Sequence, residues 1–174
     1  LAILILGSAT VAGYAINQPN ARQNTATSNQ SGKTFAGWVV DNEKSKLAIQ
    51  ITQSGAVVPG HFDAWTAAIN FDPDNLAAAS AKVEVDVASL SLGSVSENAI
   101  SPNFLNAALH PVARFVSNTF VSTGDNSYEA RGQLTLAGQS RPVTLPFKLR
   151  IENGRAFVKG EVAIRRLDFD IGKK

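Results

Sequence analysis

From Trp38 onward, apolar and polar residues alternate along much of the chain, which is the spacing of strands with one buried and one solvated face. The clearest run covers residues 81–87, where Ala and Val positions alternate with Lys82, Glu84 and Asp86. Similar runs cover residues 46–51, 128–136, 143–151 and 156–165. A chain with this period predicts an all-β domain.

Turn residues stand between the alternating runs. Gly124-Asp125-Asn126 and Glu152-Asn153-Gly154 contain residues that tolerate positive φ, so both predict hairpin turns. Many strands joined by hairpins predict an antiparallel barrel or sandwich, and a barrel is favoured because closure removes exposed sheet edges. About eight strands leave an interior that side chains fill or that holds one small ligand.

Residues 96–109 break the alternation. Ser101 and Pro102 can cap and start a helical turn, which would place Phe104 and Leu105 on one apolar face. We expect one short helix near the barrel mouth, with an ordinary surface loop as the alternative.

Small residues occupy several positions that the alternation directs inward, and they leave volume that larger side chains would fill. These positions are Ala81, Ala113, Ala130, Gly132, Ala156 and Gly160. The pattern favours a cavity over a solid core, although small residues also occur at barrel corners.

The chain begins with an uncharged apolar run over residues 1–16, which is shorter than the roughly 20 residues that span a bilayer. We interpret this run as a truncated signal peptide or anchor, with a buried strand or helix as the alternative. Residues 17–37 are rich in Asn, Gln, Ser and Thr and predict a polar linker, so the domain covers residues 38–174. An export signal in a chain without cysteine predicts a bacterial periplasmic protein.

Composition excludes several kinds of chemistry. The chain has no Cys and only two His, His61 and His110, which excludes thiol chemistry and argues against a metal site. No serine stands in a nucleophile motif, so we predict no catalytic residue, no metal and no cofactor. A net charge of +2 does not support a nucleic-acid partner. His61 is expected to be solvated, while His110 could contact a polar head group at the rim.

Short motifs follow one another in a set order along the domain. They are Trp38-Val39-Val40-Asp41, Gly60-His61-Phe62, residues 69–73, residues 83–87, Pro111-Val112-Ala113-Arg114-Phe115, residues 132–138 and residues 168–172. Together they resemble the YceI-like family over residues 38–172. The resemblance implies a lipocalin-like antiparallel barrel with a hydrophobic cavity for polyisoprenoids or similar amphiphiles, in exported bacterial proteins. It implies no catalytic chemistry.

The chain departs from the family pattern near the expected cavity mouth and at its end. Residues 94–98 stand where members often carry an Arg-Asp pair, and His110-Pro111 stands where members commonly have Phe-Pro. Members continue into a final strand, whereas this chain stops at Lys174. We therefore expect a fragment whose barrel lacks its last strand.

The residues predicted to line the cavity are the large apolar ones that the alternation places inside, together with two from the helical segment. They are Leu47, Ile49, Ile51, Phe62, Ile69, Phe71, Val83, Val85, Phe104, Leu105, Phe115, Leu134, Val143, Leu145, Phe147 and Val158. For each of them, plain core packing is the alternative.

The sequence thus predicts binding and sequestration or transport of a long-chain isoprenoid lipid or quinone. Burying a five-carbon unit contributes about 4 kcal/mol, micromolar affinity needs about 8 kcal/mol, and association costs roughly 4–15 kcal/mol, so about three to six buried units are required. Two alternatives stay open, an enzyme acting on such a lipid through His110 and a filled barrel that serves as an interaction module. Transient membrane contact through Arg165-Arg166 and Lys173-Lys174 and a homodimer are further expectations.

Overall fold

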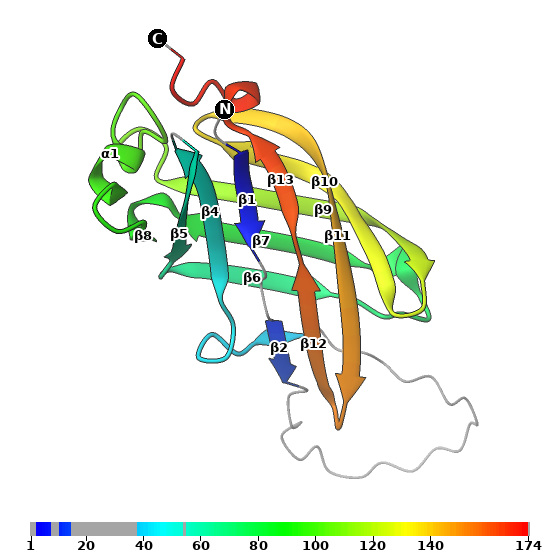
Figure 1. Cartoon of the computed structure of the whole chain (residues 1–174). Helices are drawn as coiled ribbons and strands as arrows, with labels where there is room; N and C mark the ends of the chain where they lie inside the picture. Colours follow the sequence, from blue (N-terminus) through cyan, green and yellow to red (C-terminus); the bar gives the residue numbers. More distant parts are fainter. Residues whose placement is uncertain (1–2, 8–10, 15–37, 54, 174) are drawn as a thin grey trace, which may run out of the picture.

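The computed structural model describes residues 3–7, 11–14, 38–53 and 55–173. Most of these residues belong to antiparallel strands that curl around an apolar interior (Figure 1). The predicted all-β, barrel-like fold with one short helix is therefore confirmed. No helix in the described part of the chain is long and apolar enough to cross a membrane.

The described strands form two sheets. The first has the order β13-β1-β4-β5-β8, made of Val162–Arg165, Ile3–Gly7, Leu47–Gln53, Ala56–Phe62 and Leu90–Ser91. The second has the order β3-β2-β12-β11-β10-β9-β7-β6, made of Val39–Val40, Val11–Tyr14, Arg155–Gly160, Gln139–Glu152, Ser127–Leu136, Val112–Gly124, Ser80–Asp86 and Trp65–Asn70. In Figure 1 the strands β4 and β13 run steeply across β7 and β9, which is an orthogonal packing of sheets.

Two features close the barrel. The chain passes from β12 to β13 through Glu161 alone, so one continuous segment contributes to both sheets. Trp38, which precedes edge strand β3, forms a bridge with Ile69 of β6, the other edge strand of the eight-stranded sheet, and its backbone N–H donates to the Ile69 carbonyl at 2.8 Å. The eight-stranded sheet is thereby closed on itself, and the five-stranded sheet is joined to it through Glu161.

Parts of the apolar N-terminal run are strands here. Ile3–Gly7 pairs with both β13 and β4, and Val11–Tyr14 pairs with β12 and β3. Strand β1 thus has a hydrogen-bonded neighbour on both sides, β4 and β13. The signal peptide or anchor stays a prediction, and the linker predicted for residues 17–37 lies outside the described residues.

The short helix differs in position from the expectation. Helix α1 covers Ser96–Ile100 and ends before Ser101, whose extended backbone is the conformation preferred by a residue that precedes proline. The Ser96 hydroxyl donates to the Gly93 carbonyl at 2.8 Å and accepts from the Leu92 N–H at 2.7 Å, which fixes the start of the helix. Residues 101–110 form turns instead.

Short 3-10 turns complete the described chain: η1 (Leu76–Ala78), η2 (Val87–Ser89) and η3 (Arg166–Phe169). The turn η3 and the residues after it cover one end of the barrel, where Phe169 and Ile171 are buried. The Gly172 N–H donates to the Asn103 carbonyl at 3.0 Å, and Arg166 donates to the Ile171 carbonyl at 2.7 Å. The C-terminal turn is therefore tied to the segment that follows α1.

A β-bulge bends the long hairpin of β9 and β10 at Gly132, where the pairing register shifts. A Cβ atom on Gly132 would lie 2.2 Å from the Val116 carbonyl oxygen, so only glycine fits. Ser117 is buried, and its hydroxyl donates to the Arg131 carbonyl at 2.8 Å. That hydrogen bond links β9 to β10 beside the bulge.

Candidate functional site

The barrel contains a cavity of about 220 Å³. Its wall combines apolar residues of both sheets with one residue after α1. The lining residues are Trp38, Leu47, Ile49, Phe62, Trp65, Ala67, Ile69, Phe71, Ala81, Val83, Val85, Leu105, Ala113, Arg114, Phe115, Phe120, Ala130, Leu134, Leu136, Val143, Leu145, Phe147, Ala156, Val158, Gly160, Val162 and Ile164. The side chains of the barrel therefore do not fill its interior.

Strand periodicity explains how the wall is built. On β6, Trp65, Ala67 and Ile69 line the cavity, whereas Thr66 and Ala68 between them are exposed. Successive side chains of a strand point to opposite faces, so each strand contributes every second residue. The small residues among the inward positions leave the space that the larger ones enclose.

An aromatic cluster closes one end of the cavity. The Phe71 ring contacts the rings of Phe120, Tyr128 and Phe147 edge to face, with centroids 5.4, 5.2 and 5.6 Å away. Edge-to-face contacts of this kind add about 0.5–1.5 kcal/mol each to the stability gained by burial. The Trp38 indole lies against the same end, held by a 2.8 Å hydrogen bond from its Nε1 to the Phe71 carbonyl.

The opposite end of the barrel is packed by a cluster that includes Leu105, Leu136 and Ile164, with Phe169 and Ile171 of the C-terminal turn. Leu105 is 6% exposed and lines the cavity, and its N–H donates to the Ala99 carbonyl at 3.0 Å. The segment after α1 thus packs against this end of the barrel, where the sequence predicted a helical face, although the segment forms turns.

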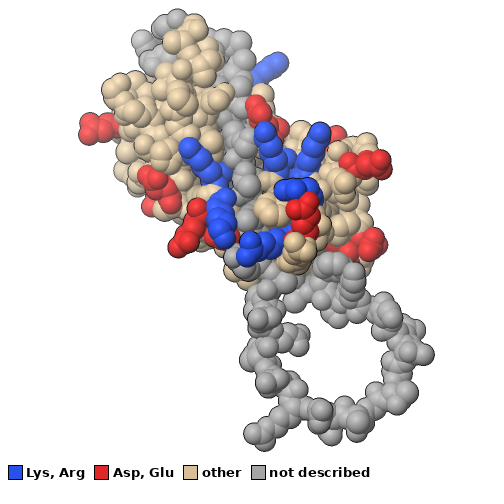
Figure 2. Space-filling model, turned by 60° about the horizontal axis from the view of Figure 1, so that its bottom comes forward, with Lys and Arg blue, Asp and Glu red and all other residues tan. Residues whose placement is uncertain are grey.

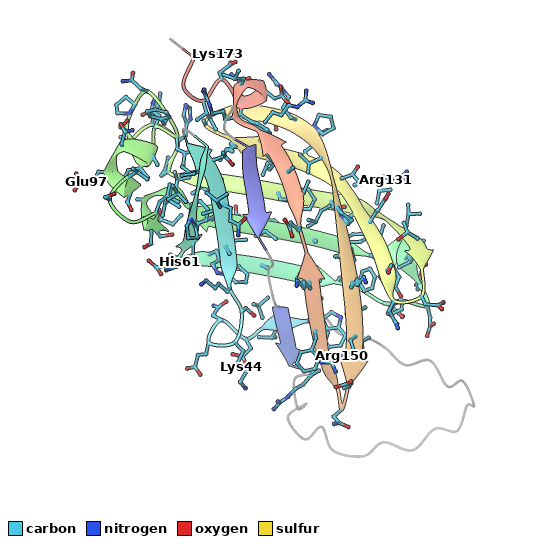
Figure 3. All side chains as sticks on the ribbon, in the orientation of Figure 1. Lys44, His61, Glu97, Arg131, Arg150 and Lys173 are labelled. Carbon is cyan, nitrogen blue, oxygen red and sulfur yellow. The ribbon has the colours of Figure 1, made fainter. Side chains whose placement is uncertain are left out.

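The cavity wall is almost wholly without charge. Among the described lining residues Arg114 alone is ionisable, and its guanidinium pairs on the outside with Glu84 at 2.7 Å. Hydrogen bonds from Lys82 and then from Arg114 lower the pKa of Glu84 below its usual 4.5. The ionisable side chains labelled in Figure 3 lie at the periphery of the barrel, so the interior suits an uncharged apolar ligand.

Most of the predicted lining residues are found in the wall. Fourteen of the sixteen line the cavity, and Ile51 and Phe104 do not. Ile51 packs at the margin of the core towards the β4–β5 hairpin. Phe104 faces the C-terminal turn, because an added Cβ on Gly172 would lie 3.3 Å from its ring.

The prediction for small residues was nearly complete: five of the six inward positions line the cavity, and Gly132 instead forms the bulge. Sequence reasoning did not single out eight further lining residues. They are Trp38, Trp65, Ala67, Arg114, Phe120, Leu136, Val162 and Ile164. The alternation at residues 65–69 and at 160–164 was the signal that could have found four of them.

Neither histidine lies in the cavity wall. The His61 Nε2 lies 3.0 Å from the Asp63 carboxylate on the surface. The His110 ring lies beside Gly138 of the β10–β11 turn, where an added Cβ would be 2.6 Å from the ring. Within the described part of the chain, no group of three or more His, Asp or Glu could hold a metal ion.

An antiparallel barrel with an apolar internal cavity places the protein in the lipocalin-like structural class. The YceI-like domain matches residues 38–174. The chain therefore belongs to the YceI-like family, and the resemblance found in the sequence is confirmed.

Known relatives agree with this membership. A UPF0312 protein of Ectopseudomonas mendocina is 28% identical over 99% of this chain and 87% of its own length. A UPF0312 protein of Vibrio cholerae is 30% identical over 63% of this chain, and the match spans 61% of the Vibrio protein.

Two solved structures share the fold. The crystal structure of Burkholderia cenocepacia BcnA has a TM-score of 0.74 and 30% identity, covering 77% of this chain and 86% of BcnA. The Campylobacter jejuni YCEI protein has a TM-score of 0.59 and 22% identity, covering 66% of this chain and 72% of its own. The second comparison bears on the fold alone.

Proposed function

We propose that this protein binds the isoprenoid tail of a lipid or quinone inside the barrel and sequesters or carries it in the bacterial periplasm. The observation that carries the proposal is the cavity wall, which consists of aliphatic and aromatic side chains apart from Arg114 and Gly160. An apolar interior space of this size favours ligand binding over a filled barrel that serves only as a scaffold.

The cavity volume sets an expectation for ligand length. A cavity of about 150 Å³ holds one benzene ring, so 220 Å³ corresponds to about nine carbon atoms, or about two isoprene units. Micromolar affinity requires about three to six buried units. A longer tail is therefore bound only if the walls move apart around it, and tight binding depends on that expansion.

The wall also argues for binding without chemical conversion. An enzyme acting on the tail needs a base or nucleophile beside it, and the described residues of the cavity lining include no His, Asp, Glu, Lys, Ser or Thr. His110 was the candidate base, and its ring lies against the β10–β11 turn instead. The described lining residues thus supply no base or nucleophile for the alternative function as an enzyme.

Intrinsic fluorescence offers a direct test, because both tryptophans of the chain, Trp38 and Trp65, line the cavity. Titration with prenols of increasing length should change the tryptophan emission, with affinity rising as the tail lengthens. Affinity that does not depend on tail length would contradict the proposal. Mass spectrometry of an organic extract of protein purified from its native host would then identify the ligand, and recovery of unchanged lipid would support carriage.

A matched pair of variants on β6 tests whether the ligand binds inside the cavity. Ala67 lines the cavity and faces Val83, whereas its neighbour Ala68 is exposed and faces Lys82. Ala67→Phe fills part of the cavity and should weaken binding about tenfold, since displacing about two methylenes removes about 1.6 kcal/mol. Ala68→Phe should bind as the parent does. Equal effects of the two variants would place the ligand elsewhere.

A further inference from the structure

The outer surface of β11 and β12 carries a group of basic side chains, here called the basic face and defined as Lys148, Arg150, Arg155 and Lys159. All four are exposed. Lys148 lies directly opposite Lys159 in the pairing of the two strands. Figure 2 shows Lys and Arg side chains gathered on the side of the molecule that comes forward in that view.

Folding does not explain the two central lysines. Like charges directly opposite each other destabilise an antiparallel pair. Glu152 pairs with Arg150 at 2.7 Å at the edge of the face, but within the described part of the chain no acidic side chain forms an ion pair with Lys148 or Lys159. Both lysines thus leave their charge available to a partner.

The basic face carries a charge opposite in sign to that of the rest of the domain. Residues 38–173 contain 13 basic and 14 acidic side chains, for a net charge of −1. The basic face together with Glu152 carries +3, which leaves −4 on the remainder of these residues. Such a separation orients the molecule toward an anionic surface, because it attracts one side and repels the other.

Apolar side chains accompany the cations. Val39 is 47% exposed and lies in line with Arg155, because Tyr14 of β2 pairs with both residues. Phe157 lies under Arg150, whose guanidinium carbon is 4.7 Å from the ring centroid. Cations mixed with exposed apolar groups are typical of surfaces that rest at the head-group level of a membrane.

We propose that the basic face is the surface by which this protein docks on a membrane rich in anionic phospholipids. The proposal goes beyond ligand binding in the cavity and does not depend on what the cavity holds. It also moves the expected membrane contact from Arg165-Arg166 and the C-terminal lysines to the β11–β12 surface.

Vesicle flotation of the full chain tests the proposal. The protein should float with vesicles of phosphatidylglycerol and phosphatidylethanolamine but not with phosphatidylcholine vesicles, and high salt should abolish flotation because it screens the charges. Each lysine near the surface contributes about 1 kcal/mol, a factor of about five, so Lys148→Gln with Lys159→Gln should lower binding about 25-fold.

The control removes the same charge elsewhere. Lys82 and Lys173 are exposed and pair with Glu84 and Asp170 respectively, away from the basic face. The double variant Lys82→Gln with Lys173→Gln should float as the parent does. If it loses as much binding as the basic-face variant, net charge alone attracts the protein, and the proposal is wrong.

Further readouts separate docking from folding and from the cavity. The basic-face variant should melt at the parent temperature or higher, because a like-charge pair has been removed, and it should keep prenol binding in the absence of vesicles. If the double variant fails to fold, the two single variants, each expected to lose about fivefold, decide the matter. Unchanged flotation of the variants, or binding to duplex DNA with none to anionic vesicles, would overturn the proposal.

Discussion

The indole Nε1 of Trp38 donates a 2.8 Å hydrogen bond to the backbone carbonyl of Phe71. The backbone N–H of Trp38 also donates to Ile69 at 2.8 Å, so one residue holds the start of the domain to the end of β6. Because Trp38 and Phe71 both line the cavity, these two bonds hold the edges of the eight-stranded sheet together and also fix the aromatic end of the cavity.

Trp38→Phe should therefore lower the free energy of unfolding by about 1–3 kcal/mol, the cost of leaving a part-buried carbonyl without its partner. Urea denaturation measures the change. Trp65→Phe is the control, since Trp65 also lines the cavity but lies outside this hydrogen bond, and it should cost less. Equal losses in the two variants would show that lost ring area, and not the hydrogen bond, matters.

Leu134→Ala should lower the stability of the fold while enlarging the cavity for longer ligands. Leu134 is 7% exposed and lines the cavity, so its truncation enlarges an existing space and should cost about 2–5 kcal/mol of stability. The same variant should bind longer prenols relatively better than the parent, as judged by tryptophan emission. A variant with the parent's preference for tail length would argue that the cavity volume does not limit the ligand.

Gly60→Ala should destabilise the C-terminal end of β5, where this strand pairs with β8. A Cβ at this position would lie 2.4 Å from the Ser91 carbonyl oxygen and 2.6 Å from the Leu92 side chain, so β8 would have to shift. Overpacking of this kind costs about 1–3 kcal/mol. Gly160→Ala, where the nearest atom would be 3.0 Å away, should cost less in thermal melting, and the reverse order would contradict the explanation.

The ion pairs of Glu84 should make the stability of the folded protein fall at acidic pH. Hydrogen bonds from Lys82 and Arg114 lower the pKa of Glu84 below 4.5, so the folded state holds this proton less tightly than the unfolded state. Their stabilisation is complete above about pH 4.5 and is lost as the pH falls through the lowered pKa. In Glu84→Gln, urea midpoints should fall less between neutral and acidic pH.

Salt provides the control for this prediction. Lys82, Arg114 and Glu84 are partly exposed, so high ionic strength should weaken their interaction and shrink the difference between parent and variant. An acid sensitivity that is identical in parent and Glu84→Gln at low salt would show that other carboxylates determine it.

Alternation predicted the strands and most of the wall because the side-chain period of a strand fixes which residues share a face. Val83 and Val85 were placed correctly on that basis alone. The same signal could not locate the break at Glu161, since Gly160 and Val162 keep their inward phase while the segment changes partners from β11 to β1. Which strand pairs with a segment depends on residues distant in the sequence, so the alternation within that segment does not reveal the change from β11 to β1.

Local signals were less reliable where a segment plugs the barrel. Ser101-Pro102 fits a helix start, yet α1 begins at Ser96 and ends at Ile100, because Ser101 precedes a proline and is extended. Phe104 then faces the C-terminal turn and not the cavity. The Trp38 hydrogen bond to Phe71 spans 33 residues and leaves no local trace in the sequence, so only the folded structure shows it.

The hydroxyl of Ser117 and the missing side chain of Gly132 together hold the alignment of the β9–β10 hairpin. Sliding β10 by one position would turn Arg131 inward and Leu134 to water, an error that would reverse every side chain along it. The bulge therefore favours the one alignment that keeps Leu134 in the cavity wall and Arg131 in solvent.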